Sequence, residues 1–234
     1  MTAERANLTD PWERVASLAE VGVMAASLLH ELRASLFAAR GRMELAVARN
    51  QPIGPEAARE ILGHLNDLDE LLGSWGGMAQ TDEPMLRFDI HEPVGRALGL
   101  MEARRREVDA SVVLVPSQVS PMILGRPGAI RQVVVNLVQN ALDAVEGGAE
   151  RQIRLSTEVS ASRVRLTVDD SGPGIARDQR ERVLEAFVTS KAPGRGTGLG
   201  LFLARRLVEG SSGRLLVEES PAGGARMVVD LPAA

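Results

Sequence analysis

Two asparagines and an aspartate recur at helical spacing in the middle of the chain. Asn136, Asn140 and Asp143 lie four and three residues apart in the segment NLVQNALDA, so one face of a helix would carry all three side chains. Asparagine is a poor residue for a helix interior, because its side chain competes for backbone hydrogen bonds. A solvated helix face is the plain alternative, but the spacing favours a site whose amide and carboxylate oxygens bind a ligand or a metal.

The same helix has a second, apolar face that predicts burial. Its apolar residues recur at intervals of three and four, and they are Ile130, Val134, Leu137, Ala141 and Val145. We therefore expect a helix from about Pro127 that buries one face and presents the polar row on another.

Two glycine-rich turns follow this helix. The first, Asp170–Ile175, reads DSGPGI, and the second, Gly194–Leu201, reads GRGTGLGL. Either turn alone is a weak signal, and Asp170 by itself is a common residue of a turn after a strand. The second turn precedes a predicted helix over 201–209, whose first backbone amides can receive phosphate groups.

In this order, the asparagine helix and the two glycine turns resemble the ATP-binding domain shared by gyrase, Hsp90, MutL and the histidine kinases. The resemblance implies ATP and Mg²⁺ as cofactors, with Asn140 as the magnesium ligand and Asp170 as the reader of the adenine amino group. The residues that the resemblance assigns to ATP binding are Asn136, Asn140, Asp143, Asp170, Gly172, Gly174, Ile175, Lys191, Gly196, Thr197, Gly198, Leu199 and Gly200.

Two details of this resemblance bear on the chemistry. Gyrase and Hsp90 carry a water-activating glutamate at the position of Asn136, and an amide cannot act as a base, so direct hydrolysis of ATP is disfavoured. The segment FVTSK, residues 187–191, resembles the flexible lid of the family, which makes Lys191 the candidate for a γ-phosphate contact. Arg195 carries the same charge and is the competing candidate.

The first third of the chain has the pattern of two long helices. Apolar residues alternate at spacings of four and three over residues 13–49 and again over 56–79, and a turn with two prolines, 50–55, separates the two runs. This pattern predicts an antiparallel helical hairpin. One hairpin leaves its apolar seam half covered, whereas two hairpins close a four-helix bundle, so we expect a homodimer.

His30 and Glu31 lie on the first of these helices. A histidine at an outward helix position is ordinarily a surface residue, but HELRASL, residues 30–36, is similar to the phosphoacceptor box of sensor histidine kinases. The resemblance implies that His30 attacks the γ-phosphoryl group of ATP while Glu31 handles the proton on the other ring nitrogen. Two departures from the family are Ser35, where proline is usual, and Arg126, where aspartate is common.

From about Met85 onward, the apolar pattern changes to that of a mixed α/β domain. Strands are predicted over 85–90, 111–115, 153–159, 164–168, 215–218 and 227–231, and helices over 93–106, from 127, and over 201–209. The expected fold class is α plus α/β: a dimeric antiparallel four-helix bundle followed by a two-layer α/β sandwich of the gyrase, Hsp90, histidine kinase and MutL type. The expected domains are an extension over 1–14, a dimerisation and phosphoacceptor hairpin over 15–80, and a catalytic ATP-binding domain over 85–234.

Composition sets limits on location and partners. The chain has 234 residues, 27 basic and 31 acidic, a net charge of −4 and no cysteine, which suits a soluble globular protein and argues against a nucleic-acid binder. No apolar run is long enough to span a bilayer, and residues 1–13 lack the pattern of a signal peptide, so we expect a cytoplasmic protein without a membrane span. Nothing before Trp12 is long enough for a sensor domain, so the signal is expected from a separate sensor protein or a further domain.

Through this resemblance, the sequence predicts a protein histidine kinase of two-component signal transduction. It would phosphorylate itself on His30 with Mg-ATP and pass the phosphoryl group to an aspartate in the receiver domain of a separate response regulator. Two alternatives stay open. One is a serine kinase of the anti-sigma type, which shares the ATPase domain but does not explain His30 and Glu31. The other is a nucleotide-binding signalling scaffold without transfer.

Overall fold

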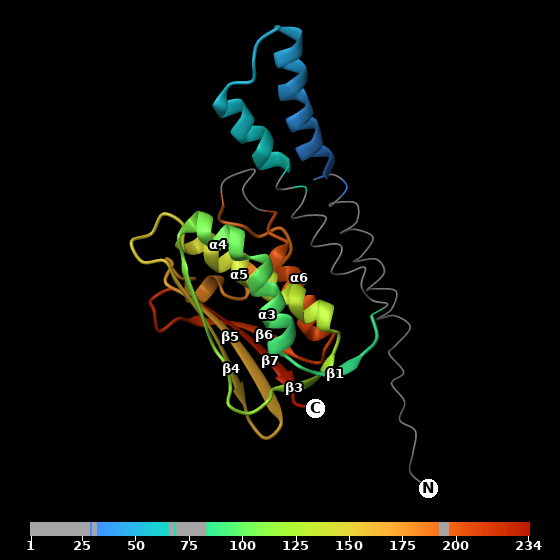
Figure 1. Cartoon of the computed structure of the whole chain (residues 1–234), viewed down its shortest axis with the longest axis vertical. Helices are drawn as coiled ribbons and strands as arrows, with labels where there is room; N and C mark the ends of the chain where they lie inside the picture. Colours follow the sequence, from blue (N-terminus) through green and yellow to red (C-terminus); the bar gives the residue numbers. More distant parts are fainter. Residues whose placement is uncertain (1–28, 30–31, 66–67, 69–82, 192–196) are drawn as a thin grey trace. The chain divides into compact units, whose positions relative to one another are not determined.

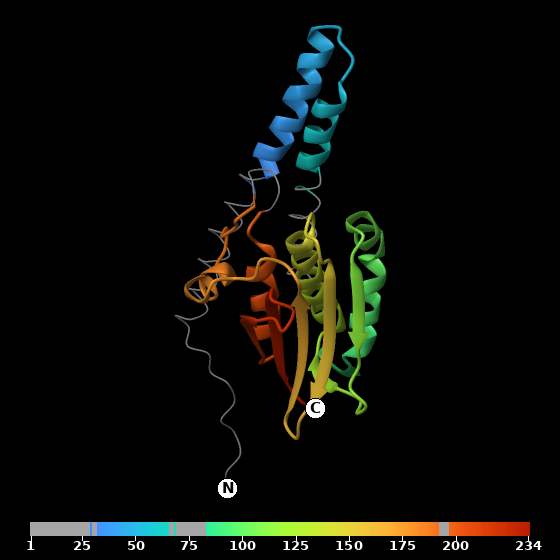
Figure 2. The same cartoon turned by 90° about the vertical axis from the view of Figure 1, so that its left-hand side faces the viewer.

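The computed structural model describes residues 29, 32–65, 68, 83–191 and 197–234. The chain forms two compact units, Met1–Leu71 and Leu72–Ala234, and each unit is described by itself (Figure 1, Figure 2). Among the described residues, no helix combines the length and the apolar character that crossing a membrane requires.

The first unit contains a helical hairpin. Its helices cover residues 32–48 and 55–65 and lie side by side in both views (Figure 1, Figure 2). The connection begins near Asn50, whose φ of 47° ends the first helix. The second helix starts with Pro55, at a position where a missing amide hydrogen is tolerated.

A small core and an ion pair join the two helices. Ala39 and Ile61 are the buried hydrophobic residues among those described in this unit, with 1% and 8% of their surface exposed. Arg42 and Glu60 form an ion pair of 2.6 Å across the hairpin. The first helix continues through Ser35, because serine keeps the amide hydrogen that proline lacks.

The second unit is built on a five-stranded sheet with the strand order β2-β4-β5-β7-β6. The β2–β4 pair is parallel and the other pairs are antiparallel. In chain order, the elements of this unit are β1 (Leu86–Asp89), α3 (His91–Leu100), α4 (Glu102–Val108), β2 (Ser111–Val115), β3 (Met122–Gly125), α5 (Pro127–Val145), β4 (Gln152–Val159), β5 (Arg163–Asp170), the 3₁₀ turns η2 (Arg177–Gln179) and η3 (Arg182–Leu184), α6 (Gly200–Glu209), β6 (Arg214–Glu219) and β7 (Ala225–Pro232).

One face of the sheet shares a hydrophobic core with α3, α5 and α6. In β5, Val164, Leu166 and Val168 are buried in this core, whereas Arg165 points to the other face and is exposed. Helix α5 contributes every residue of its predicted apolar stripe, each with 3% or less of its surface exposed. The two-layer α/β sandwich is therefore confirmed.

Two parts of the predicted secondary structure are wrong. The single helix expected over 93–106 is two helices, which separate at Met101, where φ is −87° and ψ is 0° and the amide is shared between the carbonyls of Ala97 and Leu98. The strand β3 is absent from the sequence-based prediction, and it pairs with β1 in an antiparallel two-stranded sheet. The residues of β3, MILG, are all apolar or glycine, so no alternation of apolar and polar residues marks this strand in the sequence.

Candidate functional site

Asn136, Asn140 and Asp143 lie half-buried along α5 at the predicted spacing. Both polar atoms of the Asn136 amide are hydrogen-bonded: its oxygen accepts a hydrogen bond of 2.9 Å from Nε2 of Gln132, and its Nδ2 donates one of 3.0 Å to the carbonyl of Gly200. Among the described residues, the side chain of Asn140 has no hydrogen-bond partner. Asn136 therefore joins α5 to the start of α6, whereas the amide oxygen of Asn140 is available to a ligand.

The carboxylate of Asp143 is shared by two cations. Its Oδ2 accepts a hydrogen bond of 2.6 Å from Nζ of Lys191. Its Oδ1 accepts one of 3.1 Å from Nη2 of Arg104 and one of 2.9 Å from Nε2 of Gln139. Burial disfavours the charged form of Arg104, but hydrogen bonds to carboxylates, above all that of Glu146, outweigh it and raise the pKa of this guanidinium. The pairing brings Lys191 to the polar face of α5.

Asp170 ends β5 and is almost fully buried, at 3% exposure. Its Oδ1 accepts the backbone N–H groups of Gly172 at 2.8 Å and Ala225 at 3.1 Å. The described residues contain no fully buried side-chain oxygen without a partner, and Oδ2 has no hydrogen bond within them, so Oδ2 keeps some exposed surface. Burial raises the pKa of Asp170, and the two N–H groups oppose this rise by stabilising the ionised form.

Glycine is required where the first turn meets α5 and the β6–β7 turn. A Cβ on Gly172 would lie 2.8 Å from the carbonyl oxygen of Ala144, so the turn packs directly on the end of α5. Gly174 has a φ of +74°, which favours glycine. A Cβ on Gly224 would lie 2.7 Å from the amide nitrogen of Gly172, which places the β6–β7 turn against the first glycine turn. The sequence pattern alone does not identify Gly224, and its one signal is the glycine doublet at 223–224.

The second glycine turn is closed by two residues in the left-handed conformation. Phe187 has a φ of +64° and Gly198 one of +67°, and the amide of Phe187 donates a hydrogen bond of 3.0 Å to the carbonyl of Gly198. A Cβ on Gly198 would lie 2.6 Å from the carbonyl carbon of Phe187, so only glycine fits. A phenylalanine in this region is strained, and here the strained residue anchors the loop that carries Lys191.

The other predicted site residues lie in or beside the glycine turns, or fall outside the part of the chain that the structure describes. Oγ1 of Thr197 accepts the amide of Leu199 at 3.3 Å, and Leu199 itself is buried. Gly200 begins α6, and Ile175 is half-buried against the core. The predicted residues that lie outside the described part of the chain are His30, Glu31, Arg195 and Gly196.

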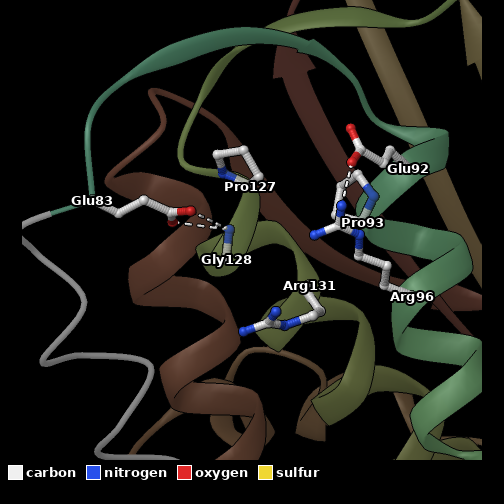
Figure 3. A pocket seen from close by; sticks show the side chains of 7 residues that line it. All are labelled: Glu83, Glu92, Pro93, Arg96, Pro127, Gly128 and Arg131. Atoms are coloured by element: carbon white, nitrogen blue, oxygen red, sulfur yellow. Dashed lines mark hydrogen bonds and ion pairs between the residues drawn. The ribbon is translucent and has the colours of Figure 1, made fainter.

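At the other end of α5, Glu83 supplies a cap that the helix does not supply itself. Arg126 occupies the N-cap position without a side-chain cap, and the amide of Gly128 instead donates to both carboxylate oxygens of Glu83, at 2.9 and 3.1 Å (Figure 3). Nε of Arg126 also donates to the backbone carbonyl of Glu83 at 2.8 Å. The aspartate that is common in the family at position 126 is a residue that caps a helix locally. In this chain Arg126 supplies no such cap, and Glu83, 43 positions earlier, takes the role.

A hollow of about 260 Å³ opens beside this cap, between α3 and the start of α5 (Figure 3). The residues that line it are Glu83, Glu92, Pro93, Arg96, Pro127, Gly128 and Arg131. Asn140 lies roughly 20 Å further along α5 than Pro127, at 1.5 Å per helical residue. None of the residues that line the hollow is one that the sequence predicts to bind a nucleotide.

Comparison with known proteins gives a consistent result for the second unit. The family model described as "Histidine kinase-, DNA gyrase B-, and HSP90-like ATPase" matches residues 125–234. The chain is 33% identical over 226 residues to the sensor-type histidine kinase PrrB of Mycobacterium leprae, a match that covers 93% of this chain and 49% of that protein. The chain spans about half the length of the curated relatives it matches.

The chain resembles solved structures of histidine kinases, among them a domain of PrrB and the kinase ThkA. The ATP-binding domain of PrrB from Mycobacterium tuberculosis is 33% identical with a TM-score of 0.52, and the match covers 64% of this chain and 98% of that domain. Histidine kinase ThkA, in complex with the response regulator protein TrrA, has a TM-score of 0.73 at 21% identity. That match covers 100% of this chain and 69% of the ThkA chain, and it shows a shared fold.

Proposed function

The chain belongs to the histidine kinase family, and from this premise we propose that it phosphorylates itself on His30 with ATP and passes the phosphoryl group to a response regulator. The observation that carries the proposal is the meeting of three motifs around α5. The first glycine turn packs on the end of α5 at Ala144, and Asn136 binds the second glycine turn at Gly200. We assign residues 85–234 as the catalytic ATP-binding domain.

In the proposed complex, Asp170 reads the adenine. Two backbone N–H groups hold its Oδ1, which leaves Oδ2 to accept a hydrogen bond from the exocyclic amino group of the base. The ionised carboxylate is the stronger acceptor, and the N–H groups of Gly172 and Ala225 favour that form. Gly172 lets this turn pack on α5, and Gly174 lets it adopt a positive φ, so the two glycines shape the backbone that would lie beside the base.

The residues present fit a magnesium ion beside the phosphates. Asn140 offers an unpartnered amide oxygen, among the described residues, on the polar face of α5. Mg²⁺ prefers oxygen ligands, of which few come from the protein and the others from water and phosphate. Bound there, the ion would neutralise charge on the phosphate oxygens during transfer. Lys191 and the amides at the start of α6 would hold the remaining phosphate charge.

His30 acts as the nucleophile, and Asn136 disfavours the competing hydrolysis of ATP by water. A neutral imidazole nitrogen of His30 forms a bond to the γ-phosphorus as the bond to the departing ADP oxygen breaks, and Glu31 takes the proton from the other ring nitrogen. Asn136 cannot activate water in competition, because an amide is not a base. The phosphoryl group then passes to an aspartate in the receiver domain of the regulator. Because ATP and response regulators are cytoplasmic molecules, we place the reaction in the cytoplasm.

We further infer that residues 15–80 form a homodimeric four-helix bundle. Leu29, Leu36 and Met43, which lie seven residues apart on the predicted seam, have exposed fractions of 54%, 55% and 41%. Ala39, which belongs to the other half of the same seam, is buried within the hairpin. A second copy would cover the exposed stripe and close the bundle.

Incubation with γ-labelled ATP tests the proposed function. Acid-labile label on the protein is expected, because phosphohistidine is the product. Acid-stable label would favour the serine kinase, and ATP binding without any label would favour the scaffold. His30→Gln should abolish labelling and leave ATP affinity unchanged, since acceptor and nucleotide site lie in different units. His64→Gln, on the second helix, is the matched control and should retain the label.

A further inference from the structure

Asp143 stands between two cations, and only one of them belongs to the proposed nucleotide site. Lys191, the proposed phosphate contact, lies 2.6 Å from Oδ2, and Arg104 lies 3.1 Å from Oδ1. The side chain of Asp143 is 18% exposed, against 24% for Arg104 and 30% for Lys191. Charges that are screened from water to this degree interact more strongly than charges on an open surface.

The charges around Asp143 must rearrange when ATP arrives. If Lys191 turns to the γ-phosphate, its contact with Asp143 is lost, and the carboxylate then lies near a polyphosphate of the same sign. A mostly buried carboxylate without a cation is strongly unfavourable. The departure of Lys191 therefore needs a second cation on Asp143. Arg104 provides one, because its guanidinium is always charged and has several donors.

Arg104 is held in place for this role by further carboxylates. Its guanidinium contacts Glu146 at 2.9 Å and Glu107 at 3.1 Å, so the group is fixed from several sides. Arg106, two residues further along α4, pairs with Glu102 instead. The arrangement is therefore particular to Arg104 and does not follow from the general basic character of α4.

We propose that Arg104 is a positioning residue for the phosphoryl donor: it aims Asp143 at Lys191 before ATP binds and neutralises Asp143 once Lys191 has moved to the γ-phosphate. The inference rests on the proposed function, because it uses Lys191 as the γ-phosphate contact. It extends that function to a residue outside the three motifs. ADP has no γ-phosphate, so Arg104 should matter for the binding of ATP and hardly at all for that of ADP.

Isothermal titration calorimetry with Mg-ATP and Mg-ADP on the full chain tests this role. Arg104→Gln should weaken ATP binding by about 5- to 10-fold, the size of a typical coupling between contacting residues, and should leave ADP binding within about twofold of the parent. Asp143→Asn removes the charge that Arg104 neutralises, so adding Arg104→Gln to it should weaken ATP binding no further. Arg106→Gln removes an equal charge from the same helix and should bind both nucleotides as the parent does.

If Arg104→Gln weakens ATP and ADP binding equally, the role of Arg104 is overturned. The same holds if Arg104→Gln still weakens ATP binding in the Asp143→Asn background. If thermal unfolding shows that Arg104→Gln does not fold, Arg104→Lys takes its place. A single ammonium cannot bridge Asp143 and Glu146 as a guanidinium does, so a smaller ATP-specific loss is expected, and no loss would refute the role.

Lys191→Gln separates this inference from the proposed function. If this variant keeps the parent ratio of ATP to ADP affinity, the γ-phosphate contact itself is wrong, and the role of Arg104 falls with it. If Lys191→Gln lowers the ratio but Arg104→Gln does not, only the role of Arg104 is wrong.

Discussion

Replacing Asp170 with asparagine should separate nucleotide binding from stability. The substitution keeps the shape of the side chain and an oxygen that accepts the N–H groups of Gly172 and Ala225. The amide nitrogen then takes the place of Oδ2 and presents hydrogens to the adenine amino group, which presents hydrogens as well. The acceptor is lost together with its charge.

The expected loss of ATP affinity follows from this one hydrogen bond. A hydrogen bond to a charged group contributes about 1.5–3 kcal/mol, and each 1.4 kcal/mol changes an affinity tenfold. Asp170→Asn should therefore bind ATP roughly 10- to 100-fold more weakly than the parent, as measured by isothermal titration calorimetry.

The nucleotide-free Asp170→Asn variant should melt at the same temperature as the parent or higher. Burial raises the pKa of Asp170 in the folded protein. The contribution of this group to stability is then fully present below its unfolded pKa and is lost as the pH rises through its folded pKa. Asparagine does not titrate, so the gain in melting temperature should be largest at neutral pH and should disappear on acidification.

Asp169 is the matched control, because it lies next to Asp170 and faces the opposite side of β5. Its carboxylate accepts hydrogen bonds of 2.7 and 3.0 Å from Arg226, and only 6% of its side chain is exposed. Asp169→Asn should lower the free energy of unfolding by about 1.5–3 kcal/mol. Its ATP affinity should equal that of the parent, because Asp169 offers no acceptor to the adenine. An Asp170→Asn variant that melts below the parent at neutral pH, or that binds ATP as tightly as the parent, would refute the reasoning.

Three further experiments test other assignments made from the structure. Asn140→Ala should abolish the Mg²⁺-dependent part of ATP binding, measured with and without EDTA, because the metal loses its proposed side-chain ligand. Leu36→Lys should convert dimers to monomers in analytical ultracentrifugation, because it places a charge in the stripe that a second copy would cover. Glu83→Ala should lower the free energy of unfolding by about 1 kcal/mol, the usual effect of losing an N-cap, and Arg126→Asp in the same chain should restore it by capping α5 locally. Unchanged Mg-ATP binding, a persistent dimer or a failed rescue would contradict the respective assignment.

Much of the site is visible in the sequence because α5 carries two periodic signals at once. Its apolar stripe fixes which face is buried, and the spacing of Asn136 and Asn140 then fixes where their side chains emerge. The glycine turns are visible for a different reason. Gly172 and Gly198 lie where any Cβ would collide with backbone, so no other residue type fits.

The contacts that the sequence does not reveal are those between distant charged residues. Arg104 lies 39 residues before Asp143, and Glu83 lies 45 residues before Gly128. Each is one charged residue in a chain that has 27 basic and 31 acidic ones, and neither spacing belongs to a helical or strand period. Only the folded arrangement of α4, α5 and the segment before β1 selects these partners.

The identity of residue 136 has a structural reason as well as a chemical one. Nδ2 of Asn136 donates a hydrogen bond to the carbonyl of Gly200, the first residue of α6. An ionised glutamate at this position has no hydrogen to donate, and its charge would face a carbonyl oxygen. The hydrogen bond that ties the second glycine turn to α5 is therefore one that a water-activating glutamate cannot make. In the proposed reaction, the same amide that holds this turn in place leaves the γ-phosphoryl group to the imidazole of His30.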